Sequence, residues 1–220
     1  MQAPALVIFD MDGLIFDSEL AFMHTLQEVM AEYGLTMTRE VYEETLGLSL
    51  ADTRTVILRH YGPDAPFETI YREGRKRQNE KAARRGLPVK PGIRELLAWL
   101  KEQELPSCLA SSSPRTTIEV YLRSAGLSGA FSFVISGDDI RNSKPDPEIF
   151  LRCCEHYGVR PAEAVVLEDS ENGIRAAVAG GIPVICIPDM KQPAKGLAAQ
   201  TAAMCPDAFA VRGLLAQSLS

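Results

Sequence analysis

The chain has 220 residues, of which 46% are hydrophobic and 24% charged, which is the balance of a globular protein. This length suits one large domain, or one domain with a smaller insert. The formal net charge of −6 argues against a nucleic-acid-binding protein, which needs a basic surface. No apolar run approaches the roughly 20 residues that a membrane-spanning helix requires, so we expect no membrane segment.

The N-terminus and the cysteines favour a cytoplasmic location. Residues 1–4 lack the basic segment that begins a secretory signal peptide, and they lead straight into an apolar stretch. The five cysteines are odd in number and form no C-x-x-C pair, so we expect reduced, buried thiols. A monomer is the default expectation for so short a chain.

The first half of the chain predicts one strand followed only by helices. Residues 5–9 are an apolar run typical of a buried strand. Gly34, Gly47 and Gly86 punctuate the region that follows, and no strand pattern occurs between residues 17 and 86. The apolar spacing and the end signals predict four helices in this region, at about 18–33, 38–46, 50–61 and 66–85.

The second half alternates between helices and strands after a proline-rich junction at 87–92. Strands are predicted at about 106–110, 132–135, 164–167 and 183–187, with helices at about 92–103, 114–125, 147–157 and 170–179. Alternation of this kind predicts an α/β fold in which helices cover both faces of a Rossmann-like parallel sheet. We therefore predict a core of residues 1–16 and 87–220, interrupted by an all-helical cap of residues 17–86. The alanine-rich tail beyond Asp189 gives no clear pattern.

Two carboxylates follow the first predicted strand. Asp10 and Asp12 are separated by one residue and are followed by Gly13. Residues two apart in extended backbone point the same way, so both carboxylates can face one small volume beyond the strand end. Ligands bind at this edge of parallel sheets. A calcium loop is the alternative, but the glycine comes too early, and Ala21 stands where such a loop needs a glutamate.

Three further polar features follow strands, or precede a helix, on the same predicted edge. They are Ser111-Ser112-Ser113, Lys144 in a loop, and Glu168-Asp169. Each has a simpler explanation alone, because serines before a proline cap helices, acids suit helix N-termini and loop lysines are common. Together they make an acidic cluster that needs a cation. Oxygen ligands alone favour Mg²⁺, and Mg²⁺ with lysine and serine forms a phosphate-binding set.

The motifs, in their order along the chain, resemble the haloacid dehalogenase superfamily. The resemblance rests on four motifs: Asp10-x-Asp12-Gly13, Ala110-Ser111, Lys144-Pro145 and Glu168-Asp169-Ser170. It covers nearly the whole chain, and the helical block after the first motif resembles the subfamily with a helical cap. The stretches Asp12–Glu19 and Leu167–Gly173 look like the branch that contains β-phosphoglucomutases and sugar phosphatases.

The resemblance implies a role for each residue. Asp10 would be the nucleophile that forms an aspartyl-phosphate, and Asp12 the general acid and then base. Ser111 and the backbone amide of Ser112 would hold phosphoryl oxygens, and Lys144 would neutralise charge. The metal set would be Asp10, the Asp12 carbonyl, Asp169 and Glu168, the last directly or through water.

These roles imply a Mg²⁺-dependent phosphatase acting on a small phosphorylated metabolite, such as a sugar phosphate. The second aspartate, Asp12, disfavours a dehalogenase, because members that cleave carbon–halogen bonds lack it. A β-phosphoglucomutase-like isomerase is the alternative. Leu50 and Phe22 weaken that alternative, since the family's mutases have an arginine and a histidine at the matching positions. A basic run in the last cap helix is expected to be a solvated face, although one side chain could contact an anionic substrate: Arg72, Arg75, Lys76, Arg77, Lys81, Arg84 and Arg85.

Overall fold

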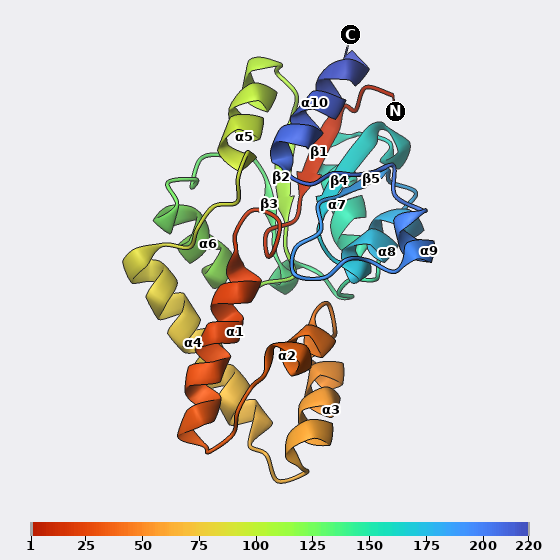
Figure 1. Cartoon of the computed structure of the whole chain (residues 1–220). Helices are drawn as coiled ribbons and strands as arrows, with labels where there is room; N and C mark the ends of the chain where they lie inside the picture. The colour runs from red at the N-terminus through yellow and green to blue at the C-terminus, as the bar shows by residue number, and fades with distance from the viewer. Residues whose placement is uncertain (1, 220) are drawn as a thin grey trace.

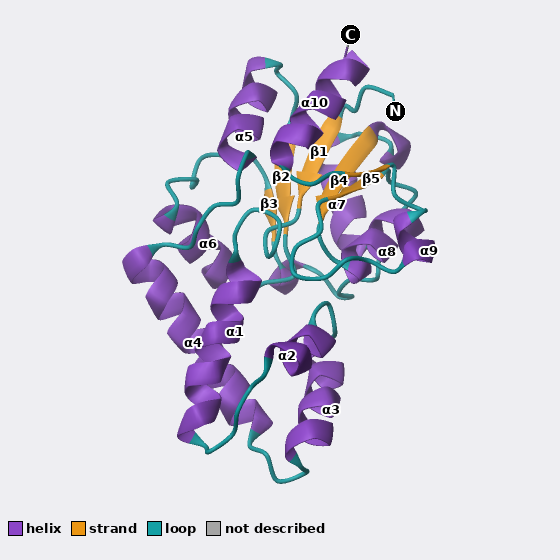
Figure 2. Ribbon diagram, viewed as in Figure 1, coloured by secondary structure: helices purple, strands orange, loops and turns teal. Residues whose placement is uncertain are grey.

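A six-stranded parallel sheet forms the centre of the larger part of the molecule, in a computed structural model that describes residues 2–219 (Figures 1 and 2). The strands are β1 (Leu6–Phe9), β2 (Ser107–Ala110), β3 (Val134–Ile135), β4 (Ala164–Glu168), β5 (Val184–Cys186) and β6 (Ala203–Met204). Their order is β3-β2-β1-β4-β5-β6, so the chain extends the sheet first on one side of β1 and then on the other. Ligands bind at such a switch point, beyond the carboxyl end of β1.

Helices cover both faces of the sheet. One face carries α5 (Ile93–Glu102), α6 (Arg115–Ser124) and α10 (Ala208–Leu219), and the other carries α7 (Glu148–Tyr157), α8 (Glu171–Ala179) and α9 (Lys195–Ala198). Alternate residues of β1 serve the two sides: Val7 and Phe9 pack in the first cluster, Leu6 and Ile8 in the second. All four side chains are fully buried, so the strand is apolar throughout. The predicted α/β fold with a parallel sheet is therefore confirmed.

Four helices lie between β1 and α5, as the sequence predicts. They are α1 (Ser18–Glu32), α2 (Arg39–Thr45), α3 (Leu50–Tyr61) and α4 (Phe67–Arg85). In Figure 1 they form a separate group below the sheet, beyond the carboxyl end of β1. This group has a hydrophobic cluster of its own, which includes Phe22, Met30, Tyr42 and Phe67.

The chain leaves the sheet and returns to it through two adjoining segments. Phe16 forms an antiparallel bridge with Val89, and the amide of Asp17 donates to the carbonyl of Pro88 over 3.1 Å. The amide of Lys90 donates to the carbonyl of Ile15 over 2.8 Å. The entry and exit of the helical group are thus fastened side by side.

The element predictions were incomplete at two places. The strand predicted at 132–135 is shorter than expected and covers only Val134–Ile135. It is an edge strand that pairs with β2 alone. Beyond Asp189 the chain forms α9, β6 and α10, which were not predicted. β6 has only two residues, too few to show alternation, and the alanines around it carry little hydrophobic contrast.

Candidate active site

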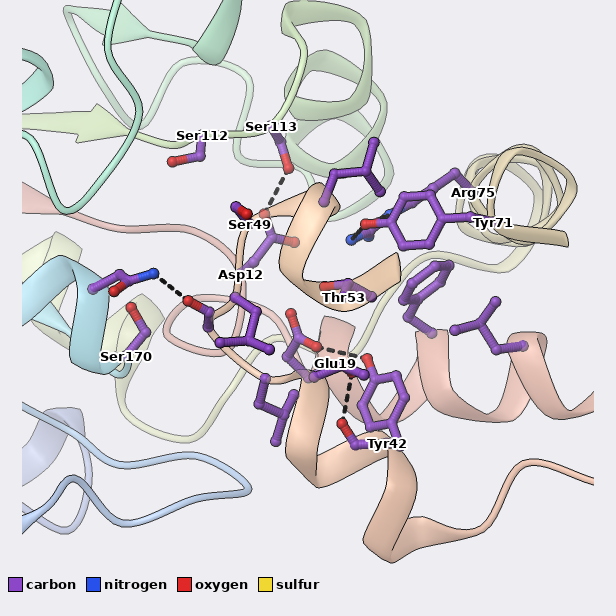
Figure 3. Close-up of a pocket in the computed structure, with 18 of the residues that line it drawn as sticks. Asp12, Glu19, Tyr42, Ser49, Thr53, Tyr71, Arg75, Ser112, Ser113 and Ser170 are labelled. Carbon is purple, nitrogen blue, oxygen red and sulfur yellow. Dashed lines mark hydrogen bonds between the residues drawn. The ribbon is translucent and has the colours of Figure 1, made fainter. Parts of the chain in front are cut away.

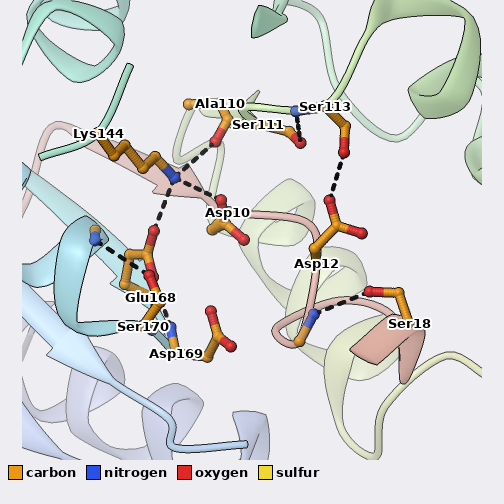
Figure 4. A network of polar contacts seen from close by, with 12 residues as sticks. Asp10, Asp12, Ser18, Ala110, Ser111, Ser113, Lys144, Glu168, Asp169 and Ser170 are labelled. Atoms are coloured by element: carbon orange, nitrogen blue, oxygen red, sulfur yellow. Dashed lines mark hydrogen bonds and ion pairs between the residues drawn. The ribbon is translucent and has the colours of Figure 1, made fainter. Parts of the chain in front are cut away.

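The predicted site residues meet at the carboxyl edge of the sheet. Asp10 follows β1, Ser111 follows β2 and Glu168 is the last residue of β4. β1 lies between β2 and β4, so the sheet itself places these three side chains around one point (Figure 4). Lys144 comes from the loop before α7 and completes the group. It precedes a cis proline, Pro145.

Lys144 makes two buried ion pairs at the centre of the site. Its Nζ lies 2.5 Å from Asp10 Oδ1 and 2.7 Å from Glu168 Oε1, and it donates to the Ala110 carbonyl over 3.3 Å. The lysine side chain is only 7% exposed. Burial by itself lowers the pKa of Lys144, but the two carboxylates outweigh burial and raise the pKa above its usual value. The lysine is therefore held in its charged form.

The carboxylates exceed the charge that one lysine can neutralise. Burial raises the pKa of Asp10 to about 8, with Glu168 and Asp12 adding to the effect and Lys144 opposing it. Burial, and then the charges of Glu168 and Asp10, also raise the pKa of Asp169 well above its usual value. Oxygens of Asp10, Glu168 and Asp169 lie within 4.8 Å of one another. An all-oxygen set of this kind fits a hard divalent cation.

Glu168 is fixed at both oxygens. Oε1 accepts from Lys144, while Oε2 accepts from the amides of Asp169 and Ser170 over 2.9 and 2.8 Å and from Ser170 Oγ over 3.0 Å. Gly173 in α8 provides the space, because a Cβ there would lie 1.8 Å from Glu168 Oε1. This requirement explains the glycine three residues after Ser170.

We expect Gly173→Ala to destabilise the protein, although alanine favours an isolated helix by about 1 kcal/mol over glycine. The new methyl group would collide with the Glu168 carboxylate and displace it from Lys144. Gly213→Ala is the matched control, because a Cβ at Gly213 in α10 meets nothing within 4 Å. Urea unfolding should show a loss for the first variant, of about 2 kcal/mol or more, and a gain or no change for the second. Equal effects would contradict this account of Gly173.

Asp12 faces the serine stretch that follows β2. Its Oδ2 accepts a hydrogen bond from Ser113 Oγ over 2.8 Å, and Asp12 lines the cavity beside Asp10. The resemblance gave roles to Ser111 and to the amide of Ser112, but none to Ser113. Ser111 is buried, and its Oγ accepts from the amide of Ser113 over 3.1 Å. Ser112 is exposed and lines the cavity.

A cavity of about 700 Å³ joins this site to the helical group (Figure 3). Its floor holds Asp10, Asp12 and Lys144, and its far wall is largely apolar. Two of the polar side chains on that wall, Tyr42 and Glu19, are paired with each other. Tyr42 donates from its hydroxyl to Glu19 Oε2 over 2.6 Å. Sequence reasoning missed both, since Glu19 resembled a helix-start acid and Tyr42 gave no signal.

Arg75 departs from the solvated face predicted for the basic run. Its guanidinium lies 3.8 Å from the centre of the Phe22 ring and donates to the Tyr71 hydroxyl over 2.9 Å. It lines the cavity, whereas Arg72 and Lys76 on the same helix are exposed. Arg77 and Lys81 also face α1, where they pair with Glu32 and Glu28 at a partly exposed edge, but Arg75 is the side chain of the run that lines the cavity. The predicted solvated face was therefore wrong for Arg75. The alternative, that one side chain of the run contacts an anionic substrate, fits its position.

Comparison with known proteins identifies the family. The family model described as "Haloacid dehalogenase-like hydrolase" matches residues 7–187. The chain belongs to the haloacid dehalogenase-like hydrolase family. The expected enzyme class, a phosphoric monoester hydrolase, is confirmed by relatives that are named phosphatases.

The relatives also confirm the recognised branch. The chain is 31% identical to a probable pseudouridine-5'-phosphatase of Drosophila melanogaster, over 83% of this chain and 80% of that one. It is 32% identical to a phosphorylated carbohydrates phosphatase of Thermotoga maritima, over 80% and 81%. The crystal structure of a putative β-phosphoglucomutase from Thermotoga maritima superposes with a TM-score of 0.79 at 26% identity, covering 99% of each chain.

Two further observations bear on the setting of the enzyme. Among residues 2–219, none of the helices combines the length and apolar character needed to cross a membrane. All five cysteines are free and buried, as expected: Cys108, Cys153, Cys154, Cys186 and Cys205.

Proposed function

We propose that this protein is a Mg²⁺-dependent phosphatase that hydrolyses a small phosphorylated metabolite, a sugar phosphate, through an aspartyl-phosphate. The observation that carries the proposal is the placement of Asp10. Its carboxylate is buried at the floor of the cavity, paired with Lys144 and flanked by Asp12. A nucleophile, a cation and a second acid that meet at one point are the parts that phosphoryl transfer requires.

In the proposed reaction, an Asp10 carboxylate oxygen attacks phosphorus, and the bond to the leaving alcohol breaks. Asp12 delivers a proton to that alcohol, then takes one from the water that hydrolyses the aspartyl-phosphate. Ser113 holds Asp12 Oδ2, so the other oxygen is available for proton transfer. Lys144 neutralises charge on Asp10 and the phosphoryl group, while Ser111 and Ser112 bind phosphoryl oxygens.

The metal set in this proposal is Asp10, the Asp12 carbonyl, Asp169 and Glu168. The close approach of three of these carboxylates supports it. When bound, Mg²⁺ would neutralise charge on the phosphoryl oxygens and allow the anionic nucleophile to approach the phosphorus atom.

The helical group, residues 17–86, is proposed to act as a cap on a core of residues 1–16 and 87–220. It would exclude water and select the leaving group. Asn172 of the core donates from Nδ2 to the Gly47 carbonyl of the group, which closes one side of the cavity. The free, buried cysteines support the cytoplasmic location that we propose.

The far wall of the cavity favours a monophosphate over a bisphosphate, and therefore a phosphatase over a mutase. Leu50 and Phe22 line the cavity, and neither can bind a second phosphate. Arg75 lies over the Phe22 ring, and Glu19 is an acid whose charge offsets it: burial raises the pKa of Glu19, and the charge of Arg75 opposes that rise. A mutase would need an uncompensated cation there to hold its second phosphate.

A phosphate-release screen tests the proposal. The substrates should include hexose, pentose and polyol phosphates, nucleoside monophosphates and phosphoglycolate, each with Mg²⁺ and with EDTA. We expect release of inorganic phosphate from at least one sugar or polyol phosphate, abolished by EDTA. Isomerisation of a sugar phosphate without net phosphate release would establish the mutase instead. Release that is unaffected by EDTA would contradict the metal site.

We expect Arg75→Leu to raise KM for the preferred substrate about 10-fold, with a smaller effect on kcat. Arg75 faces the leaving-group side of the cavity, so it should contribute hydrogen bonds to the substrate there, worth about 1.5 kcal/mol or more for a charged donor. Arg72→Leu is the matched control, because Arg72 is exposed on the same helix. Steady-state kinetics should give the Arg72 variant the same KM and kcat as the wild type. A normal KM for Arg75→Leu would remove this residue from the binding site.

A further inference from the structure

Asp189, in the loop after β5, has one carboxylate oxygen that is engaged and one that is not. Oδ1 accepts from Lys90 Nζ in an ion pair whose side chains are only 12% and 20% exposed. Oδ2 is buried and has no hydrogen-bond partner among the described residues. An unpaired buried carboxylate oxygen destabilises the fold, so a partner from outside the chain is expected there.

The unpaired oxygen lies beside the proposed metal set. The space next to Gly13 locates it: a Cβ on Gly13 would lie 2.1 Å from Asp169 Oδ2 and 3.3 Å from Asp189 Oδ2. Both oxygens therefore border the same face of this glycine, directly after Asp12. Asp189 and Asp169 also line the same cavity.

Asp189 is close to the metal set without belonging to it. The group of described carboxylates whose oxygens lie within 4.8 Å of one another contains Asp10, Glu168 and Asp169. Asp189 lies outside that group, which suits contact through water better than direct ligation. Mg²⁺ gives up its waters reluctantly and normally keeps several of them.

Lys90 fixes Asp189 from the opposite side. Its ammonium group neutralises the carboxylate and leaves Oδ2 as the free acceptor. The backbone of Lys90 is itself fastened, because its amide donates to the Ile15 carbonyl over 2.8 Å. The pair therefore connects the loop after β5 with the segment that follows Asp12.

We propose that Asp189 is a positioning residue for the divalent cation: its Oδ2 accepts a hydrogen bond from a water that completes the ion's coordination shell, while Lys90 holds its Oδ1. This inference rests on the metal site of the proposed function. Partners of this outer kind orient the shell of a metal, and their loss typically weakens metal binding about 10- to 100-fold. The competing explanation is an ion pair that only fastens the two segments.

Isothermal titration of the intact protein with MgCl₂ separates the two explanations. We expect Asp189→Asn to weaken Mg²⁺ binding about 10- to 100-fold. The single variant leaves Lys90 unpaired near the site, where its charge alone could repel the ion. The double variant Lys90→Met/Asp189→Asn removes that charge and should still bind Mg²⁺ at least about 10-fold more weakly than the wild type. Glu28→Gln breaks the remote Lys81–Glu28 pair by the same chemical change and should bind Mg²⁺ normally.

Urea unfolding without Mg²⁺ gives the second readout. If the pair is purely structural, its loss should lower the free energy of unfolding of the variants and leave their Mg²⁺ affinity unchanged. Wild-type Mg²⁺ affinity in the double variant would overturn the proposal. Failure of the wild-type protein to bind Mg²⁺ would instead overturn the metal site of the proposed function, so the two failures are distinguishable.

Discussion

Asp10→Asn should reduce Mg²⁺-dependent phosphate release by about 10⁴-fold or more, the scale on which loss of a nucleophile acts. The asparagine keeps the shape of the side chain and can still accept from Lys144 Nζ, so the fold should persist. It cannot form an acyl phosphate, because the amide nitrogen replaces one carboxylate oxygen and the remaining oxygen is a poor nucleophile. Circular dichroism should be unchanged.

Two controls sharpen this test. Asp64→Asn makes the same change on an exposed loop of the helical group and should leave activity intact. Acid quenching during turnover should trap phosphate covalently on the wild-type protein and on the Asp64 variant, but not on Asp10→Asn. Full Mg²⁺-dependent activity of Asp10→Asn would exclude this residue as the nucleophile.

Lys144→Met should have the largest effect on stability. The lysine neutralises two carboxylates that are almost completely buried, and removing one partner from a buried ion pair costs about 3–5 kcal/mol. Activity should fall as well, because the same ammonium group would offset charge on the phosphoryl group. Urea unfolding of metal-free protein at pH 7.5 provides the measurement.

The loss in Lys144→Met should shrink as the pH falls. In the wild type, burial raises the pKa of Asp10 to about 8 even though Lys144 lowers it, so without Lys144 that pKa rises further. A carboxyl whose pKa is higher in the folded state binds its proton more tightly there, and the folded state gains stability as the pH falls towards the ordinary value of 3.8. Asp10 is protonated in both folded proteins below about pH 8, so this contribution to the loss changes only above that pH. A loss that is equal at pH 7 and pH 9.5 would mean that burial of charge is not its cause. Arg115→Met, which breaks an exposed pair with Asp139, should cost far less.

The parts of the site that could be predicted from the sequence are those that follow strands. A parallel sheet brings all its carboxyl ends to one edge, so Asp10, Ser111 and Glu168 had to converge once the strands were recognised. Lys144 lies in a loop, and its motif alone gave it a place. The structure brings its Nζ between two carboxylates, as a cation in an acidic site requires.

The far wall of the cavity could not be predicted in the same way. Glu19, Tyr42 and Arg75 come from three helices, and which of their faces meet depends on packing that one sequence does not encode locally. Arg75 shows the limit clearly. Arg72 and Lys76 beside it are exposed, whereas Arg75 packs on Phe22 of α1 and donates to Tyr71. Ser113 was missed because the three serines are chemically identical, and the backbone conformation after β2 decides which of them reaches Asp12.

The adjoining entry and exit segments of the helical group have a consequence for how such an enzyme can diversify. Because the Phe16–Val89 bridge closes the base of the insert, residues between these points can change in length or composition while the spacing of Asp10, Lys144 and Asp169 stays the same. If the helical group selects the leaving group, as we propose, the choice of substrate can change while the chemical step is kept. Grafting the 17–86 segment of a relative onto this core should transfer substrate preference and leave the reaction unchanged.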